Sequence, residues 1–256
     1  MGVFGTALTI ILLIMTATFV VAMIIKDNSI VDIVYGLAFV LSCWAAFLCC
    51  GEAHPRALLA LGLVTLWGIR LAGHGFLRKR GEEEDFRYRK WREQWGSVFV
   101  PRSFLQIFML QGVVVFLVAL PVLLVIRQPG GALGWLDIVG TLVWLLGFAF
   151  EAVGDFQLMR FKSDPSNKGR IMQSGLWRYS RHPNYFGEAI LWWGVFLIAL
   201  GVPYGWAAVV SPMLIDFLLL KVSGIPMLEA KYEGVPEFEA YKQRTNAFFP
   251  WIPGKG

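Results

Sequence analysis

The chain has 256 residues, of which 57% are hydrophobic and only 16% are charged. This composition excludes an ordinary soluble domain and is typical of a protein that crosses a membrane several times. The formal net charge of +5 follows from basic residues in a few loops, so it gives no reason to expect nucleic-acid binding.

Seven apolar runs follow one another along the chain, and a bilayer core needs about 20 apolar residues per helix. The sequence therefore predicts an all-α, polytopic membrane bundle of about seven transmembrane helices in a single domain over 1–256. The first run has neither a basic start nor a small-residue cleavage site, so we expect a transmembrane helix there and not a signal peptide. The runs cover roughly 3–25, 29–49, 55–77, 103–127, 134–159, 186–202 and 205–222.

Lysine and arginine alternate between the two sides of these runs. Eight lie in 78–102, six in 160–181 and five in 221–255, whereas the opposite loops hold only Arg56 and Arg127. The positive-inside rule then predicts that the N-terminus is outside and the C-terminus cytoplasmic. In a bacterium the membrane would be the inner membrane.

The three cysteines, Cys43, Cys49 and Cys50, all fall in the second run and have no metal-type spacing. They predict neither a disulfide nor a metal site.

A charged segment, "RKRGEEEDFRYRKWREQWG", separates the third and fourth runs. Its interleaved aromatic residues fit an interfacial helix with rings at headgroup level. A solvated cytoplasmic loop is the alternative.

The stretch "GLWRYSRHPNYFGEAILWWG", residues 175–194, places cations directly before an apolar helix. Proline suits a first helical turn, so we expect the helix to begin near Pro183. Asn184 and Glu188 are then four apart on one face, while Arg181 and His182 stand at the positive end of the helix. The pattern predicts an anionic group bound outside and an amide-like group bound deeper.

Ionisable residues inside membrane spans are functional candidates because each costs about 2.5–3.5 kcal/mol on insertion scales. Arg70, His74 and Asp155 lie near span ends, where snorkelling is an equally good explanation. The full set is Asp32, Arg70, His74, Glu151, Asp155, Glu188 and Asp216.

Three stretches resemble the carboxy-terminal domain of the steroid 5α-reductases, and above all their bacterial relatives. They are "DFQLMRFK", the 175–194 stretch above, and "AKYEGVPEFEAYKQRTNAFFPW". The resemblance covers 150–251 strongly, as a cofactor-binding region, and 26–125 moderately. It extends to a superfamily that includes the sterol C14 reductases. No G-x-G-x-x-G is present, so a Rossmann site is not expected.

The resemblance implies an enzyme that reduces an activated C=C bond of a lipid, steroid or isoprenoid with NADPH entering from the cytoplasmic side. The adenosine and phosphate end would fall to Asp155, Arg160 and Lys162, with Arg170 in the same cationic loop. Tyr179, Arg181 and His182 would hold the diphosphate. Asn184 and Glu188 would meet the nicotinamide carboxamide. Tyr232 and Tyr241 would close over the cofactor.

One departure concerns the proton donor. The steroid enzymes use a glutamate and a tyrosine from early helices, but Trp67 stands where that tyrosine would fall, and Glu52 lies at the outer end of its span. The catalytic candidates are therefore Glu188 at the cofactor and, as donors, Tyr35, His74 and Tyr88 in falling order. We expect Asp32 to orient the Tyr35 hydroxyl.

Two other functions stay open. Isoprenylcysteine carboxyl methyltransferases carry a similar R-H-P-x-Y element and bind S-adenosylmethionine there. A non-enzymatic sterol- or lipid-binding protein is the third hypothesis, but it leaves six cations in one loop without a use. The lipid itself and the oligomeric state are not predicted.

Overall fold

The computed structural model describes residues 2–81, 83–130 and 132–254, and every regular element in them is a helix. These helices form two compact units. The first comprises 1–134 and 199–210, and the second comprises 135–198 and 211–256. The predicted cofactor-binding region, 150–251, therefore falls largely in the second unit.

Six helical stretches in the described residues are long and apolar enough to cross a membrane. The expected polytopic helical bundle is thus confirmed. The sixth predicted span, 186–202, corresponds to a helix of 17 residues, Pro183–Ala199, which is short of the usual length of about 20. The six stretches are Val3–Ile25, Ile30–Cys50, Pro55–Lys79, Phe86–Val118, Trp135–Ser163 and Gly205–Ala230.

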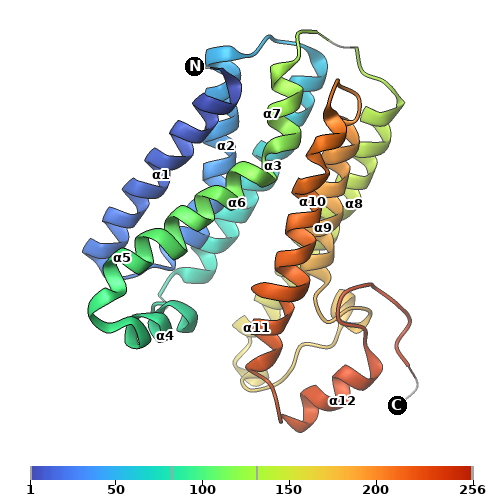
Figure 1. Cartoon of the computed structure of the whole chain (residues 1–256). Coiled ribbons are helices and arrows are strands. Elements are labelled where there is room, and N and C mark those ends of the chain that lie inside the picture. The colour runs from blue at the N-terminus through green and yellow to red at the C-terminus, as the bar shows by residue number, and fades with distance from the viewer. Residues whose placement is uncertain (1, 82, 131, 255–256) are drawn as a thin grey trace. The chain divides into compact units, whose positions relative to one another are not determined.

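The first unit is built around α2 and α3, which approach closely at a pair of glycines (Figure 1). A Cβ on Gly36 would lie 2.5 Å from the carbonyl oxygen of Gly68, so neither position has room for a side chain. The elements are α1 (Val3–Ile25), α2 (Ile30–Cys50), α3 (Pro55–Lys79), α4 (Phe86–Trp95), η1 (Gly96–Val98), α5 (Phe99–Ser103), the π-helix η2 (Phe104–Met109), α6 (Leu110–Val118), α7 (Leu120–Arg127) and η5 (Gly205–Val209).

The charged segment between α3 and α5 folds back onto the start of α2. Lys79 pairs with Asp27 at 2.8 Å, and Glu84 accepts a 2.9 Å hydrogen bond from the backbone N–H of Asn28. The segment contains a helix, α4, with Asp85 as its N-cap, which is the first of the two alternatives for this segment. Because its acids face the 26–32 turn, much of the segment is tied to the protein.

Asp32 does not orient Tyr35, so that expectation is wrong. Its Oδ1 accepts from the Tyr88 hydroxyl at 2.7 Å, and its Oδ2 pairs with Arg87 at 2.8 Å. Both partners lie 55 and 56 residues further along the chain, so the sequence pattern around Asp32 gave no sign of them.

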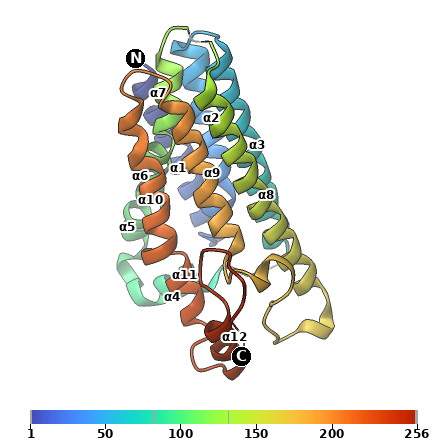
Figure 2. The ribbon, with the colours of Figure 1, turned by 90° about the vertical axis from the view of Figure 1, so that its right-hand side faces the viewer.

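The second unit consists of α8, α9 and α10, which run alongside one another (Figures 1 and 2), and a group of shorter elements. As expected, α9 begins at Pro183. The bounds are α8 (Trp135–Ser163), η3 (Pro165–Asn167), η4 (Gly175–Arg178), α9 (Pro183–Ala199), α10 (Val210–Phe217), the π-helix η6 (Leu218–Val222), α11 (Ile225–Ala230) and α12 (Pro236–Arg244).

Glycines at seven-residue intervals let α8 and α9 pack backbone to backbone. A Cβ on Gly147 would lie 2.4 Å from the Leu191 nitrogen, and one on Gly187 would lie 2.3 Å from the Glu151 nitrogen. Small residues permit this kind of approach between membrane helices. The glycine seam is Gly140, Gly147 and Gly154 on α8 with Gly187 and Gly194 on α9.

We expect Gly187→Ala to destabilise the protein by about 1–3 kcal/mol, because an added methyl group must push the two backbones apart. Gly73→Ala is the matched control, since it also lies in an apolar helix but a Cβ there meets nothing within 4 Å. Thermal unfolding of the purified protein in detergent measures both. Equal melting points for the two variants would contradict the role of the glycine seam in packing α8 against α9.

Candidate functional site

The polar groups of the second unit gather where α9 begins, beside the glycine seam. Asn184 Nδ2 donates a 3.0 Å hydrogen bond to Asp155 Oδ1. Gly154 allows this approach, because a Cβ there would lie 3.2 Å from the Asn184 nitrogen. A carboxylate only accepts, so the Asp155 contact fixes which way the amide points. The Asn184 oxygen therefore faces away from Asp155.

That oxygen, Asn184 Oδ1, is buried and has no hydrogen-bond partner among the described residues. An unsatisfied buried acceptor costs about 1–3 kcal/mol, and such groups in native proteins need an explanation. An N–H or O–H donor supplied by a ligand would satisfy it.

Two glutamates lie one helical turn from this pair. Glu188 follows Asn184 by four residues on α9 and is half-buried. Glu151 precedes Asp155 by four residues on α8 and is 3% exposed. The expected shared face of Asn184 and Glu188 is confirmed by α9, so both side chains follow the same side of the helix.

The loop that leads into α9 is fixed to α8. The Trp177 indole donates to the Gly154 carbonyl at 3.0 Å, and the backbone N–H of Leu176 donates to Gln157 Oε1 at 2.9 Å. Gly175 has φ +62°, and a Cβ there would lie 2.5 Å from the Gln157 side chain. These contacts hold the start of α9 against Asp155.

The Arg181 guanidinium hydrogen-bonds only to groups of the protein itself in the described part of the chain. Its Nε and Nη2 bind the two Glu229 oxygens at 2.8 and 3.1 Å, and its Nη1 donates to the carbonyls of Thr245 and Lys242. A two-pronged contact of this kind is strong and geometrically specific. Arg181 thus joins the start of α9 to α11 and to the end of α12.

His182 contacts the same glutamate. Its Nε2 lies 3.0 Å from Glu229 Oε1, and its ring stacks on Tyr185 with 5.5 Å between centroids. Burial lowers the pKa of His182 below its usual value and outweighs the opposing effect of Glu229. We therefore expect a neutral imidazole at pH 7.

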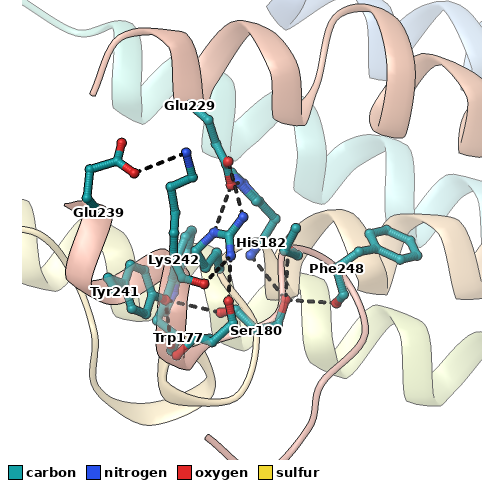
Figure 3. A network of polar contacts seen from close by, with 11 residues as sticks. Trp177, Ser180, His182, Glu229, Glu239, Tyr241, Lys242 and Phe248 are labelled. Carbon is teal, nitrogen blue, oxygen red and sulfur yellow. Dashed lines mark hydrogen bonds and ion pairs between the residues drawn. The ribbon is translucent and has the colours of Figure 1, made fainter. Parts of the chain in front are cut away.

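The C-terminal segment closes onto the same loop (Figure 3). The buried Tyr241 hydroxyl donates to the carbonyls of Trp177 and Ser180, and burial raises the pKa of Tyr241. Ser180 Oγ donates to the Phe248 carbonyl at 2.8 Å. Hydrogen bonds of Tyr241 and Ser180 therefore connect α12 and the residues after it to the 175–182 loop.

Four cations of the preceding segment stay exposed: Arg160, Lys162, Lys168 and Arg170. Of these, Arg160, Lys168 and Arg170 make no ion pair with any residue that the structure describes. Arg160 follows Asp155 by five residues, roughly 7.5 Å along α8. Arg160, Lys168 and Arg170 are therefore not held by carboxylates of the described residues.

Two other predicted cofactor residues, Tyr179 and Tyr232, lie in the loop before α9 and in the turn after α11. Tyr179 is 42% exposed, and its carbonyl accepts from the Trp251 N–H at 2.9 Å. Tyr232 is half-buried with its ring 5.3 Å from that of Phe238.

The donor candidates Tyr35 and His74 belong to the first unit, on α2 and α3. The Tyr35 ring lies 6.5 Å from Trp67. In the described ranges, no group of three His, Cys, Asp or Glu residues is arranged to hold a metal ion.

Sequence reasoning missed several residues that build this site. Glu229 carries the contacts of both Arg181 and His182, and Gln157 and Ser180 anchor the loop. Glu229 lies 47 and 48 residues from its partners, so no local spacing could identify it.

Comparison with known proteins gives the family. Residues 18–245 match the model described as "Protein of unknown function (DUF1295)". The chain belongs to the DUF1295 family. No solved structure matches it.

Two curated proteins are similar to this DUF1295 member. The uncharacterized protein C594.04c of Schizosaccharomyces pombe is 24% identical over 79% of the chain and 65% of its own length. A probable O-methyltransferase, ustE, of Ustilaginoidea virens is 35% identical over 26% of the chain and 23% of its own length. The chain thus spans less than two thirds of either relative.

We expect Arg181→Ala to lower stability by about 3 kcal/mol, since it removes the cation that pairs with the Glu229 carboxylate, 15% exposed, and leaves only the neutral His182 beside it. Lys242→Ala is the control, because its contact with Glu239 is exposed and is worth less than about 1 kcal/mol. Thermal unfolding and limited chymotrypsin digestion of 225–254, whose aromatic cleavage sites are the same in both variants, measure the change. The interpretation fails if the tail is equally protected in both variants.

The lowered pKa of His182 predicts a pH dependence. The unfolded chain protonates His182 near pH 6.5, but the folded chain does so only at lower pH. The contribution of the neutral imidazole is therefore complete above about pH 6.5 and is lost as the pH falls below it. Melting points from pH 8 to 5.5 should fall more steeply for the wild type than for His182→Gln. Parallel curves would show that His182 does not titrate in this way.

Proposed function

We propose that this membrane protein is an oxidoreductase that reduces an activated C=C bond of a lipid, steroid or isoprenoid with NADPH. The observation that carries the proposal is the buried Asn184 amide, whose orientation is fixed by Asp155 and whose oxygen lacks a donor. A nicotinamide carboxamide has an NH2 group that can donate to such an oxygen.

The cationic segment supports the phosphate end of the proposed cofactor. Arg160, Lys162, Lys168 and Arg170 are exposed and follow Asp155 within one stretch of chain. Arginine matches phosphate oxygens with two parallel hydrogen bonds. A 2′-phosphate supplies the charge that would favour NADPH over NADH.

The contacts change the role proposed for two motif residues. Arg181 and His182 bind Glu229 and the C-terminal segment, so we assign them to positioning the start of α9 and not to holding a diphosphate. Tyr241 has the same kind of role through Trp177 and Ser180. The exposed Tyr179 stays a proposed ligand of the diphosphate. Tyr232 stays a residue proposed to close over the cofactor.

NADPH, when bound, supplies the hydride. The chain's own part is to fix the carboxamide through Asn184, Asp155 and Glu188, since misplacement by about 1 Å can cost on the order of 100-fold. Reduction of an enone also needs a donor at the developing oxyanion. We keep Tyr35 as the proposed donor and His74 as the alternative. Tyr88 is set aside because its hydroxyl donates to Asp32.

The apolar helices support a lipid or steroid-like substrate that reaches the protein from the membrane. We propose that the N-terminus lies outside and that the cofactor region faces the cytoplasm, because most lysines and arginines lie in the loops on that side.

A second function, methyl transfer from S-adenosylmethionine, is favoured by the similarity to a probable O-methyltransferase. The amino group of S-adenosylmethionine is also able to donate a hydrogen bond to Asn184 Oδ1. The four exposed cations favour the reductase, because the sulfonium cofactor carries no phosphate.

The reaction can be tested with purified protein, a lipid extract and 4-deuterated NADPH. We expect deuterium at a saturated carbon of a lipid product, with less transfer from deuterated NADH. Asn184→Ala should lower transfer by about 100-fold. Mass spectrometry of the lipids provides the measurement.

Thermal shifts with NADPH, NADH and S-adenosylmethionine separate binding from turnover, since a ligand that binds only the folded state raises the melting point. Lys221→Ala removes an exposed cation outside the 160–170 segment. It is the control for substitutions to alanine of the four cations within that segment. Methylation of a lipid without deuterium transfer would replace the reductase by the second function.

A further inference from the structure

A carboxyl group in the middle of a membrane span has no part in the proposed cofactor site. Asp216 lies near the middle of the span Gly205–Ala230. Its Oδ2 accepts a 3.0 Å hydrogen bond from the indole of Trp193 on α9. Its Oδ1 is buried and has no hydrogen-bond partner among the residues that the structure describes. Ionisable residues at such depth mark binding sites or ion pathways.

This group lies on the other side of α9 from the Asn184 amide. Trp193 follows Asn184 by nine residues, which is roughly 13 Å and two and a half helical turns. Asn184 and the glycines of α9 face α8, whereas Trp193 faces α10. Asp216 therefore forms a separate site, whatever reaction the protein catalyses.

The unpartnered oxygen restricts what can bind. As a carboxylate, Asp216 needs a donor at Oδ1; as an acid, its O–H needs an acceptor. A hydroxyl group both donates and accepts, so it completes the hydrogen bonding in either state. A membrane span also selects an apolar molecule. We infer that Asp216, oriented by Trp193, binds the hydroxyl group of an apolar alcohol, such as a sterol or an isoprenol, through its Oδ1.

The local backbone supports this assignment. The α-helix α10 ends at Phe217, and the π-helix Leu218–Val222 follows directly. Single π-helical turns inside helices occur frequently at functional sites. Asp216 as a whole is half-buried, so the covered Oδ1 lies close beneath the surface of the unit.

Photo-crosslinking of the full purified chain tests the site. The probe is farnesol carrying a diazirine, and unlabelled farnesol and the hydrocarbon farnesene are the competitors. We expect the probe to label peptides of α9 and α10. The hydrocarbon can neither donate nor accept a hydrogen bond, so it should compete about 10-fold less well than the alcohol.

Asp216→Leu should reduce labelling of these peptides by about 10-fold. Met213→Leu, an exposed apolar position three residues earlier on α10, is the matched control and should label normally. Unchanged labelling of Asp216→Leu overturns the site. If that variant does not fold, the comparison in the wild type decides, and equal competition by the alcohol and the hydrocarbon would mean that Asp216 does not bind the hydroxyl group.

Discussion

The close approach of α8 and α9 is the constraint on which the candidate site depends. With any side chain at Gly147 or Gly187, the two backbones could not come within their present distance. The same approach brings Asn184 against Gly154 and within 3.0 Å of Asp155. Membrane helices gain little from the hydrophobic effect between them, so packing of this kind and hydrogen bonds must hold them together. The Asn184–Asp155 pair thus serves the packing and leaves one oxygen for a ligand.

The start of α9 is held from two directions. Trp177 and Leu176 tie its leading loop to α8, and Arg181 ties it to Glu229 and the C-terminal segment. Arg181 was expected to hold an anionic cofactor, but its role here is structural. One carboxylate and two carbonyls already satisfy most of the five donors of its guanidinium group. Arg160, Lys168 and Arg170 make no ion pair with a carboxylate in the described ranges, which is why the 160–170 segment carries the phosphate role in the proposed function.

Much of the fold could be predicted, because a bilayer imposes a minimum helix length that apolar runs reveal directly. The start of α9 at Pro183 and the shared face of Asn184 and Glu188 followed from helix chemistry. The glycine seam could not be predicted, since the need for a missing side chain comes from the partner helix. The same holds for Glu229, and for Asp32, whose carboxylate was expected to serve Tyr35 but binds Tyr88 and Arg87. Polar contacts between residues far apart in the sequence produce no regular spacing from which they could be predicted.

The two faces of α9 contact two different polar groups and keep them apart. The Asn184 amide lies on the side of α8, and the Asp216 carboxyl group lies on the side of α10. On the side of α8, close glycine contacts leave no space between backbones, so a ligand can meet Asn184 only where the helix begins. On the side of α10, the bulky Trp193 and Asp216 occupy the contact instead. Each face leaves one buried oxygen without a hydrogen-bond partner among the described residues, and because such oxygens are costly in hydrocarbon, these two are the positions at which the proposed ligands would be stabilised.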